Sequence, residues 1–216
     1  MSHMDTNQNT YHEKSYYEWS LALSIVLAAK LLLLLIDPNL RLYMGDSASY
    51  LQDALGSWNP PDRSMTYPEL IGWSAVKSKS AFSLVLLQTL MGIGVSAIVF
   101  WLLRFVGKSR LWLSILTSLI ISVEPSQLFY ERMMMAETAG LFAFLGTVAS
   151  TICFVHKGRY RWIPVIALLG IITISFRLNY LPIVIGLAIL TPVIRIAISS
   201  NFNIRNMTRS KFIRFC

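Results

Sequence analysis

Long uninterrupted blocks of apolar residues, separated by shorter polar segments, run along most of the chain. An α-helix needs about 20 residues, or a few less, to cross a bilayer core about 30 Å thick. Six blocks reach or approach that length: residues 19–36, 82–106, 111–123, 134–155, 162–176 and 178–197. The third and fifth are short, so tilt, extension by flanking residues and a partly re-entrant path all remain open for them. The pattern predicts an all-α membrane protein with about six transmembrane helices.

The first apolar block is expected to remain as an uncleaved membrane span. It is longer than the core of a typical signal peptide, and the segment before it carries Glu13 and Glu18. We therefore divide the chain into a cytoplasmic N-terminus (1–18), a transmembrane module (19–198) and a basic tail (199–216). Within the module, residues 37–81 form the only long polar loop.

The basic residues set the expected orientation, because cytoplasmic loops carry an excess of lysine and arginine. With the N-terminus in the cytoplasm, twelve fall on that side: Lys14, Arg104, Lys108, Arg110, Lys157, Arg159, Arg161, Arg195, Arg205, Arg209, Lys211 and Arg214. Six fall on the opposite side: Arg41, Arg63, Lys77, Lys79, Arg132 and Arg177. Lys30 is left within the first span. The long loop is therefore expected on the extracytoplasmic face of a bacterial cytoplasmic membrane or an ER-type membrane.

Composition supports this assignment and argues against nucleic-acid binding. The chain is 55% hydrophobic and only 14% charged, whereas a soluble domain carries about 25% charged residues. The sequence pI is near 9.7, but the basic residues are scattered among hydrophobic spans and form no continuous patch. The two cysteines, Cys153 and Cys216, provide neither a disulfide framework nor metal-ligand spacing.

Eight of the eleven acidic residues fall on the expected outer face: Asp37, Asp46, Asp53, Asp62, Glu69, Glu124, Glu131 and Glu137. Carboxylates contribute little to topology. Acid or metal chemistry at that face is one explanation, and simple exposure of a long loop is the other. Glu124, Glu131 and Glu137 could supply oxygen ligands with Asp46 to a divalent cation such as Mg or Mn, although no spacing rule defines such a site.

The long loop is expected to contain two short interfacial helices. Read as a helix from Asp46, its first part places Asp46, Ser49 and Asp53 on one face. Tyr50 and Trp58 belong to an adjoining apolar arc, which we expect at the depth of the lipid headgroups. Pro68 is expected at the first position of the second helix. Asp46 is also a good helix N-cap, a role that is compatible with catalysis.

Three charged residues near the outer ends of later spans each have a structural and a functional interpretation. Glu137 lies at the membrane boundary, where a carboxylate is costly unless it is paired or functional. Arg132 is its natural partner in a structural pair. Arg177, between the fifth and sixth spans, can extend its charge to the membrane surface, or it can bind a phosphate through two hydrogen bonds.

Four short motifs occur in order along the outer face. Residues 45–50 read Gly-Asp-Ser-Ala-Ser-Tyr, and residues 63–68 read Arg-Ser-Met-Thr-Tyr-Pro. Residues 131–138 contain Glu-Arg and then Ala-Glu-Thr, and residues 176–182 read Phe-Arg-Leu-Asn-Tyr-Leu-Pro. In this order and placement they resemble the membrane glycosyltransferases of the C-type (GT-C) fold. The closest branch contains the polyprenyl- or dolichyl-phosphate-mannose mannosyltransferases and the bacterial lipid A aminoarabinose transferases.

The resemblance implies a GT-C-like transmembrane module that uses a sugar carried on polyprenyl phosphate and inverts the anomeric carbon. It implies Asp46 as catalytic base or metal-positioning carboxylate. The candidates for binding the donor phosphate are Arg63, Arg132, Arg177, Lys77 and Lys79. The candidates for the substrate pocket are Tyr50, Asp53, Tyr67 and Glu137. Expected partners are membrane lipid and the lipid-linked sugar, and a second polypeptide that completes the enzyme is also considered.

The first interpretation is such an enzyme or its N-terminal half. The second is a non-catalytic membrane subunit that keeps the fold as a lipid-binding or scaffold element. The third is a small transporter or channel component. Transporters place charged residues near the bilayer midplane and often show repeated halves. Here the spans are nearly free of charge apart from Lys30, and this favours the first two interpretations.

Overall fold

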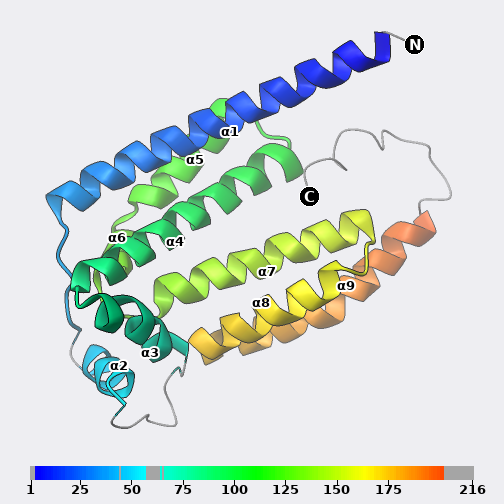
Figure 1. Ribbon diagram of the computed structural model, residues 1–216. Helices are drawn as coiled ribbons and strands as arrows, with labels where there is room; N and C mark the ends of the chain where they lie inside the picture. Colours follow the sequence, from blue (N-terminus) through cyan, green and yellow to red (C-terminus); the bar gives the residue numbers. More distant parts are fainter. Residues whose placement is uncertain (1–2, 44, 57–63, 65, 202–216) are drawn as a thin grey trace.

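The described part of the protein is a bundle of long helices with three short helices gathered at one end (Figure 1). The computed structural model describes residues 3–43, 45–56, 64 and 66–201, with side-chain environments between residues 15 and 197. The described residues form nine α-helices: α1 (His3–Ile36), α2 (Asp46–Ala54), α3 (Thr66–Ile71), α4 (Ala81–Trp101), α5 (Leu111–Val123), α6 (Pro125–Arg132), α7 (Glu137–Lys157), α8 (Trp162–Phe176) and α9 (Leu181–Asn201). Helical turns η1 (Gly72–Val76), η2 (Leu102–Val106) and η3 (Leu178–Tyr180) adjoin α3, α4 and α9.

Four helical segments in this part of the chain are long and apolar enough to cross a membrane: Ser15–Ile36, Ala81–Val106, Glu137–Lys157 and Leu178–Ala197. Helices α5 and α6 meet at a 47° bend and would count as a fifth span if they are taken together. Helix α8 has the same bounds as its apolar block but only 15 residues. The all-α membrane architecture and the positions of the apolar helices therefore agree with the sequence pattern.

Two boundaries differ from the sequence-based expectation. Residues 125–132 were expected to be loop, but they form α6, because Glu124 accepts a hydrogen bond from the backbone N–H of Gln127 (2.8 Å) and Pro125 occupies the first turn. Helix α7 begins at Glu137, whereas its apolar block begins at Met134. The backbone of Met134 instead donates to the carbonyl of Arg41 (3.1 Å), and the Arg41 N–H donates to the carbonyl of Arg132 (2.7 Å). This short bridge holds the residues before α7 in a non-helical path.

Helix α4 is central to the bundle and contacts α1, α5 and α7, and α7 in turn packs against α8 and α9. In Figure 1, α2, α3 and α6 lie at the same end of the bundle, where α1 and α8 end and α7 and α9 begin. The buried core under α2 and α3 includes Tyr50, Tyr67, Ile71, Leu84 and Phe176. Residues from the long loop, α4 and α8 thus form one apolar cluster at this end.

Near the start of its apolar part (Ser15–Ile36), α1 is joined to η2 by a charged contact. Arg104 donates through Nε (2.8 Å) and Nη2 (2.7 Å) to the two oxygens of Glu18, whose side chain is almost fully buried. Such a two-point arginine–carboxylate contact defines geometry as well as attraction. Together with the Lys30–Glu131 pair described below, it holds α1 against the rest of the bundle at two levels.

Candidate functional site

Two serine hydroxyls attach the α2–α3 loop to the bundle. Ser47, fully buried in the first turn of α2, accepts a hydrogen bond from the Tyr43 N–H (2.8 Å) and donates to the carbonyl of Met134 (3.0 Å). Ser64 donates to the carbonyl of Ser175 (2.6 Å), near the end of α8. These contacts bring the start of α2 to the segment that precedes Glu137, and they bring the start of α3 to the segment that precedes Arg177.

Tyr50 and Tyr67 lie inside the protein, which corrects the expectation that Tyr50 reaches the lipid headgroups. Tyr50 is 5% exposed and Tyr67 is 0% exposed, and their rings meet edge to face with centroids 5.0 Å apart. An edge-to-face pair of this kind packs well in a core. Trp58, expected on the same arc, lies outside the described residues.

The Tyr67 hydroxyl belongs to a buried polar cluster centred on Gln88 of α4. The Gln88 amide donates to the Tyr67 oxygen (3.1 Å) and to the carbonyls of Met133 (3.0 Å) and Met135 (3.3 Å). Burial raises the pKa of the Tyr67 phenol above its usual value of 10.0, at which the group is already protonated at neutral pH. This polar cluster holds the non-helical segment before α7 in position, and with it the start of α7.

Glu137 and Arg177 form an ion pair at this end of the bundle. Glu137 is the first residue of α7, and Arg177 follows α8. The Arg177 side chain is 33% exposed and that of Glu137 is 18% exposed, and Glu137 Oε2 has no hydrogen-bond partner among the described residues. The partner of Glu137 is therefore Arg177, not the Arg132 expected from the sequence. The pair offers a partly exposed guanidinium whose orientation is held by a carboxylate.

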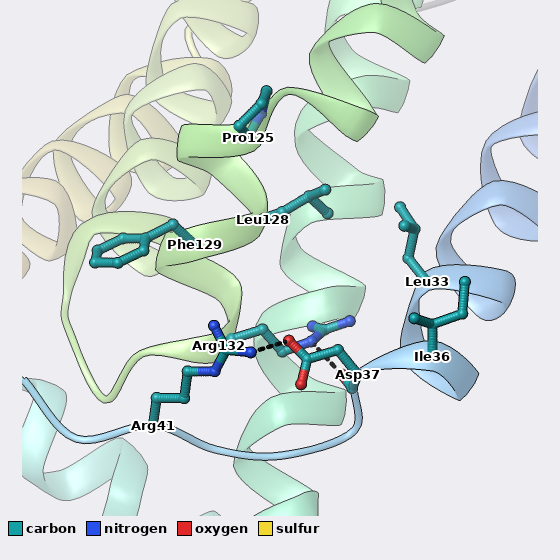
Figure 2. A pocket seen from close by; sticks show the side chains of 8 residues that line it. All are labelled: Leu33, Ile36, Asp37, Arg41, Pro125, Leu128, Phe129 and Arg132. Carbon is teal, nitrogen blue, oxygen red and sulfur yellow. Dashed lines mark hydrogen bonds and ion pairs between the residues drawn. The ribbon is translucent and has the colours of Figure 1, made fainter.

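Arg132 is used in a different place. Its Nε donates to the carbonyl of Asp37 (2.6 Å) and its Nη1 to the hydroxyl of Thr89 (3.0 Å), and the residue is only 5% exposed. Figure 2 shows the Arg132 side chain extending from α6 toward Asp37. The structure thus directs Arg132 to the end of α1 and to α4, whereas Arg177 contacts α7.

A buried ion pair that sequence reasoning left unassigned lies next to Arg132. The ammonium of Lys30 lies 2.5 Å from Glu131 Oε1, and both side chains are 0% exposed. Gln127 also donates to Glu131 Oε1 (3.1 Å), and Arg132 Nη1 lies 4.0 Å from Glu131 Oε2. A Cβ at Gly92 would collide with this carboxylate, so only glycine leaves room for it there. The signal in the sequence was a lone lysine within an apolar span, because such a charge normally requires a partner.

The remaining candidate residues lie at several places. Asp46 is the first residue of α2, with Gly45 rather than Asp46 at the N-cap position, and it is half-buried. Asp53 is half-buried near the end of α2, and Lys77 and Lys79 are exposed after η1. Arg63 lies outside the described residues. Pro68 is in the first turn of α3, which begins two residues earlier at Thr66.

The proposed carboxylate ligands of a divalent cation do not come together. No group of three or more His, Cys, Asp or Glu side chains within the described ranges could hold a metal ion. Glu124 caps α6, and Glu131 is occupied by Lys30 and Gln127. These three positions, Asp46, Glu124 and Glu131, therefore do not fit a shared cation.

Comparison with other proteins gives no match to any family model, curated protein or solved structure. Asp46 begins α2, and Glu137 and Arg177 lie at the same end of the bundle, where α7 begins and α8 ends. A carboxylate that accepts a proton and a guanidinium that binds an anionic oxygen are the chemical elements this end offers.

Proposed function

We propose that the chain is a membrane glycosyltransferase, or the N-terminal half of one, that uses a sugar carried on polyprenyl phosphate. The observation that carries the proposal is the joining of α2 to the start of α7, and of α3 to the end of α8, through Ser47 and Ser64. Those two contacts bring Asp46 to the same end as the Glu137–Arg177 pair. Two short helices that adjoin the carboxylates of Asp46 and Glu137 and the guanidinium of Arg177 suit a reaction at the membrane surface.

In the proposed reaction, Asp46 removes the proton from an acceptor hydroxyl as that oxygen bonds to the anomeric carbon. The bond from this carbon to the phosphate oxygen breaks on the opposite face, and its electron pair leaves with polyprenyl phosphate. Arg177 stabilises the charge that develops on the departing phosphate, and Glu137 orients the guanidinium. The anomeric carbon is inverted. The proposed reaction uses Arg177 and not Arg132, because Arg177 pairs with Glu137 whereas Arg132 contacts the end of α1 and α4.

The proposal includes a GT-C-like arrangement with about six membrane crossings: α1, α4 with η2, α5 with α6, α7, α8, and η3 with α9. Helix α8 is the shortest of these six crossings. Its 15 residues span about 22 Å along the helix axis, at a rise of 1.5 Å per residue. The distribution of lysine and arginine supports an extracytoplasmic location for the end that carries α2 and α3.

A second function, a non-catalytic lipid-binding or scaffold subunit, is favoured by one specific observation. Several charged residues expected to serve chemistry have structural contacts instead: Glu124 caps a helix, Glu131 pairs with Lys30, and Arg132 binds a backbone carbonyl. A membrane subunit that keeps the fold without the reaction would show the same contacts.

The deciding experiment compares the parent protein with Asp46→Asn and with the matched control Glu69→Gln. Glu69 has an exposed carboxylate on α3, the helix that contacts α2. Purified protein is given polyprenyl-phosphate-linked mannose or aminoarabinose together with a lipid extract, and transfer of labelled sugar is measured. We expect Asp46→Asn to lose about 100-fold or more of the rate and Glu69→Gln to retain it.

Equal rates for the parent and Asp46→Asn would remove Asp46 from the mechanism. Absence of transfer by the parent, with retained binding of polyprenyl phosphate, would favour the scaffold function. Repeating the assay with EDTA, and then with added Mg or Mn, tests the divalent cation. Purification from native membranes tests for a second polypeptide that completes the enzyme.

A further inference from the structure

A cleft between the end of α1 and α6 combines apolar walls with three charged side chains. Its volume is about 330 Å³, and Figure 2 shows the residues that line it. The apolar lining comes from Leu33, Ile36, Pro125, Leu128 and Phe129, and the charged lining from Asp37, Arg41 and Arg132. This cleft has no part in the proposed transfer reaction.

The charged groups are arranged as a cluster at one side of the cleft. Arg41 donates through Nη2 to Asp37 Oδ2 (2.9 Å), and Arg132 donates through Nε to the Asp37 carbonyl (2.6 Å). The Arg41 side chain is 58% exposed, so its guanidinium is accessible to a bound molecule without any change in the fold. Two arginines and one aspartate leave a net charge of +1, since the neighbouring Lys30–Glu131 pair is balanced.

The end of the first apolar span indicates the level of the bilayer at which the cleft lies. The apolar span ends at Ile36, and Asp37 is the next residue, so the charged side of the cleft adjoins the end of the hydrocarbon-spanning segment. Lipid phosphates occupy this level of a bilayer, and basic pockets between helices at a membrane surface bind lipid headgroups. Ile36 and Phe129 are 70% and 41% exposed and offer apolar surface to acyl chains.

We propose that this cleft binds a glycerophospholipid, with its phosphodiester held by Arg41 and Arg132 and its acyl chains against Leu33, Ile36, Leu128 and Phe129. A phosphodiester carries one negative charge, which matches the net charge of the cleft. Free phosphate would leave the apolar walls unused. Asp37 orients Arg41 through its carboxylate and Arg132 through its backbone carbonyl. Its carboxylate also provides a partner for the ammonium of an ethanolamine headgroup.

The test uses native mass spectrometry of the full chain in detergent, titrated separately with phosphatidylglycerol, phosphatidylethanolamine, polyprenyl phosphate and inorganic phosphate. The first variant, Arg41→Gln, removes an exposed charge. Its control, Lys108→Gln, removes an exposed charge from the opposite end of the bundle. The second variant, Leu128→Trp, fills the cleft without changing its charge. Unchanged elution volume and thermal midpoint show that each variant is folded.

We expect the parent to bind one glycerophospholipid, with about ten-fold weaker binding in Arg41→Gln, loss of binding in Leu128→Trp and no change in Lys108→Gln. Equal binding by Arg41→Gln and Lys108→Gln would overturn the site. Preference for polyprenyl phosphate would identify a different occupant. Binding of inorganic phosphate with the same affinity would show that the apolar walls do not contribute to binding. Either result overturns the proposal. Because no lipid-linked sugar is used, the outcome is independent of whether Asp46 supports transfer.

Discussion

Removal of either partner of the Lys30–Glu131 pair is expected to destabilise the protein strongly, whereas removal of both together is expected to cost little. Both side chains are 0% exposed and their charged atoms are 2.5 Å apart. At an effective dielectric constant of about 20, two unit charges at that distance attract by about 7 kcal/mol. Desolvation costs several kcal/mol for each ion, so the attraction is mostly offset and the net contribution of the intact pair is small.

The single variants differ in what they leave behind. In Glu131→Leu, Lys30 loses the carboxylate that neutralises it, with Arg132 remaining nearby. In Lys30→Met, Glu131 keeps the hydrogen bond from Gln127 (3.1 Å) and lies 4.0 Å from Arg132. Breaking a buried pair costs about 3–5 kcal/mol. We therefore expect Glu131→Leu near the upper end of that range, Lys30→Met near or below its lower end, and the double variant within about 1 kcal/mol of the parent.

The measurement is reversible unfolding of purified protein in mixed micelles with increasing sodium dodecyl sulfate, followed by tryptophan fluorescence. The four proteins form a double-mutant cycle. Leu31→Met serves as the control, because Leu31 is the next residue of α1 and is exposed on the bundle surface. If the double variant is as unstable as the sum of the two single variants, the residues are not coupled and the assignment of the pair is wrong.

Two further substitutions test the attachment of the loop. Ser47→Ala removes a buried hydroxyl that both accepts and donates a hydrogen bond, and we expect a loss of about 1–3 kcal/mol with faster protease cleavage of the long loop. Ser49→Ala, whose hydroxyl donates to the carbonyl of Gly45 one turn earlier, should not change the cleavage rate, and equal cleavage in both variants would contradict the role of Ser47. Gln88→Leu removes the amide that donates to the Tyr67 hydroxyl and to the Met133 and Met135 carbonyls, although Met133 still accepts from the Met135 N–H (2.9 Å). We expect a loss of about 2–4 kcal/mol in the unfolding assay, and an unchanged midpoint would show that the polar cluster is not needed.

The sequence alone indicated where the long apolar helices lie, although it did not indicate α6 or the later start of α7. The bounds of α5 and α8 agree with their apolar blocks to the residue, and the two short helices of the long loop were expected from their polar–apolar pattern. The physical reason is local. In a membrane each backbone N–H and C=O must be bonded within its own segment, so a long apolar run becomes a helix whatever its neighbours are.

Tertiary structure decided which charged residues meet. Lys30 and Glu131 are separated by 101 positions in the chain, and no local pattern distinguishes Arg132 from Arg177 as the partner of Glu137. Position along a span specifies the depth of a side chain but not the direction in which it points around the bundle. That direction depends on how α1 packs beside α6 and how α7 packs beside α8. A buried charge must find its counter-charge across such a contact. The pairing of ions, and the separation of the Glu137–Arg177 pair from the cleft lined by Arg41 and Arg132, therefore appear only when the helices are assembled.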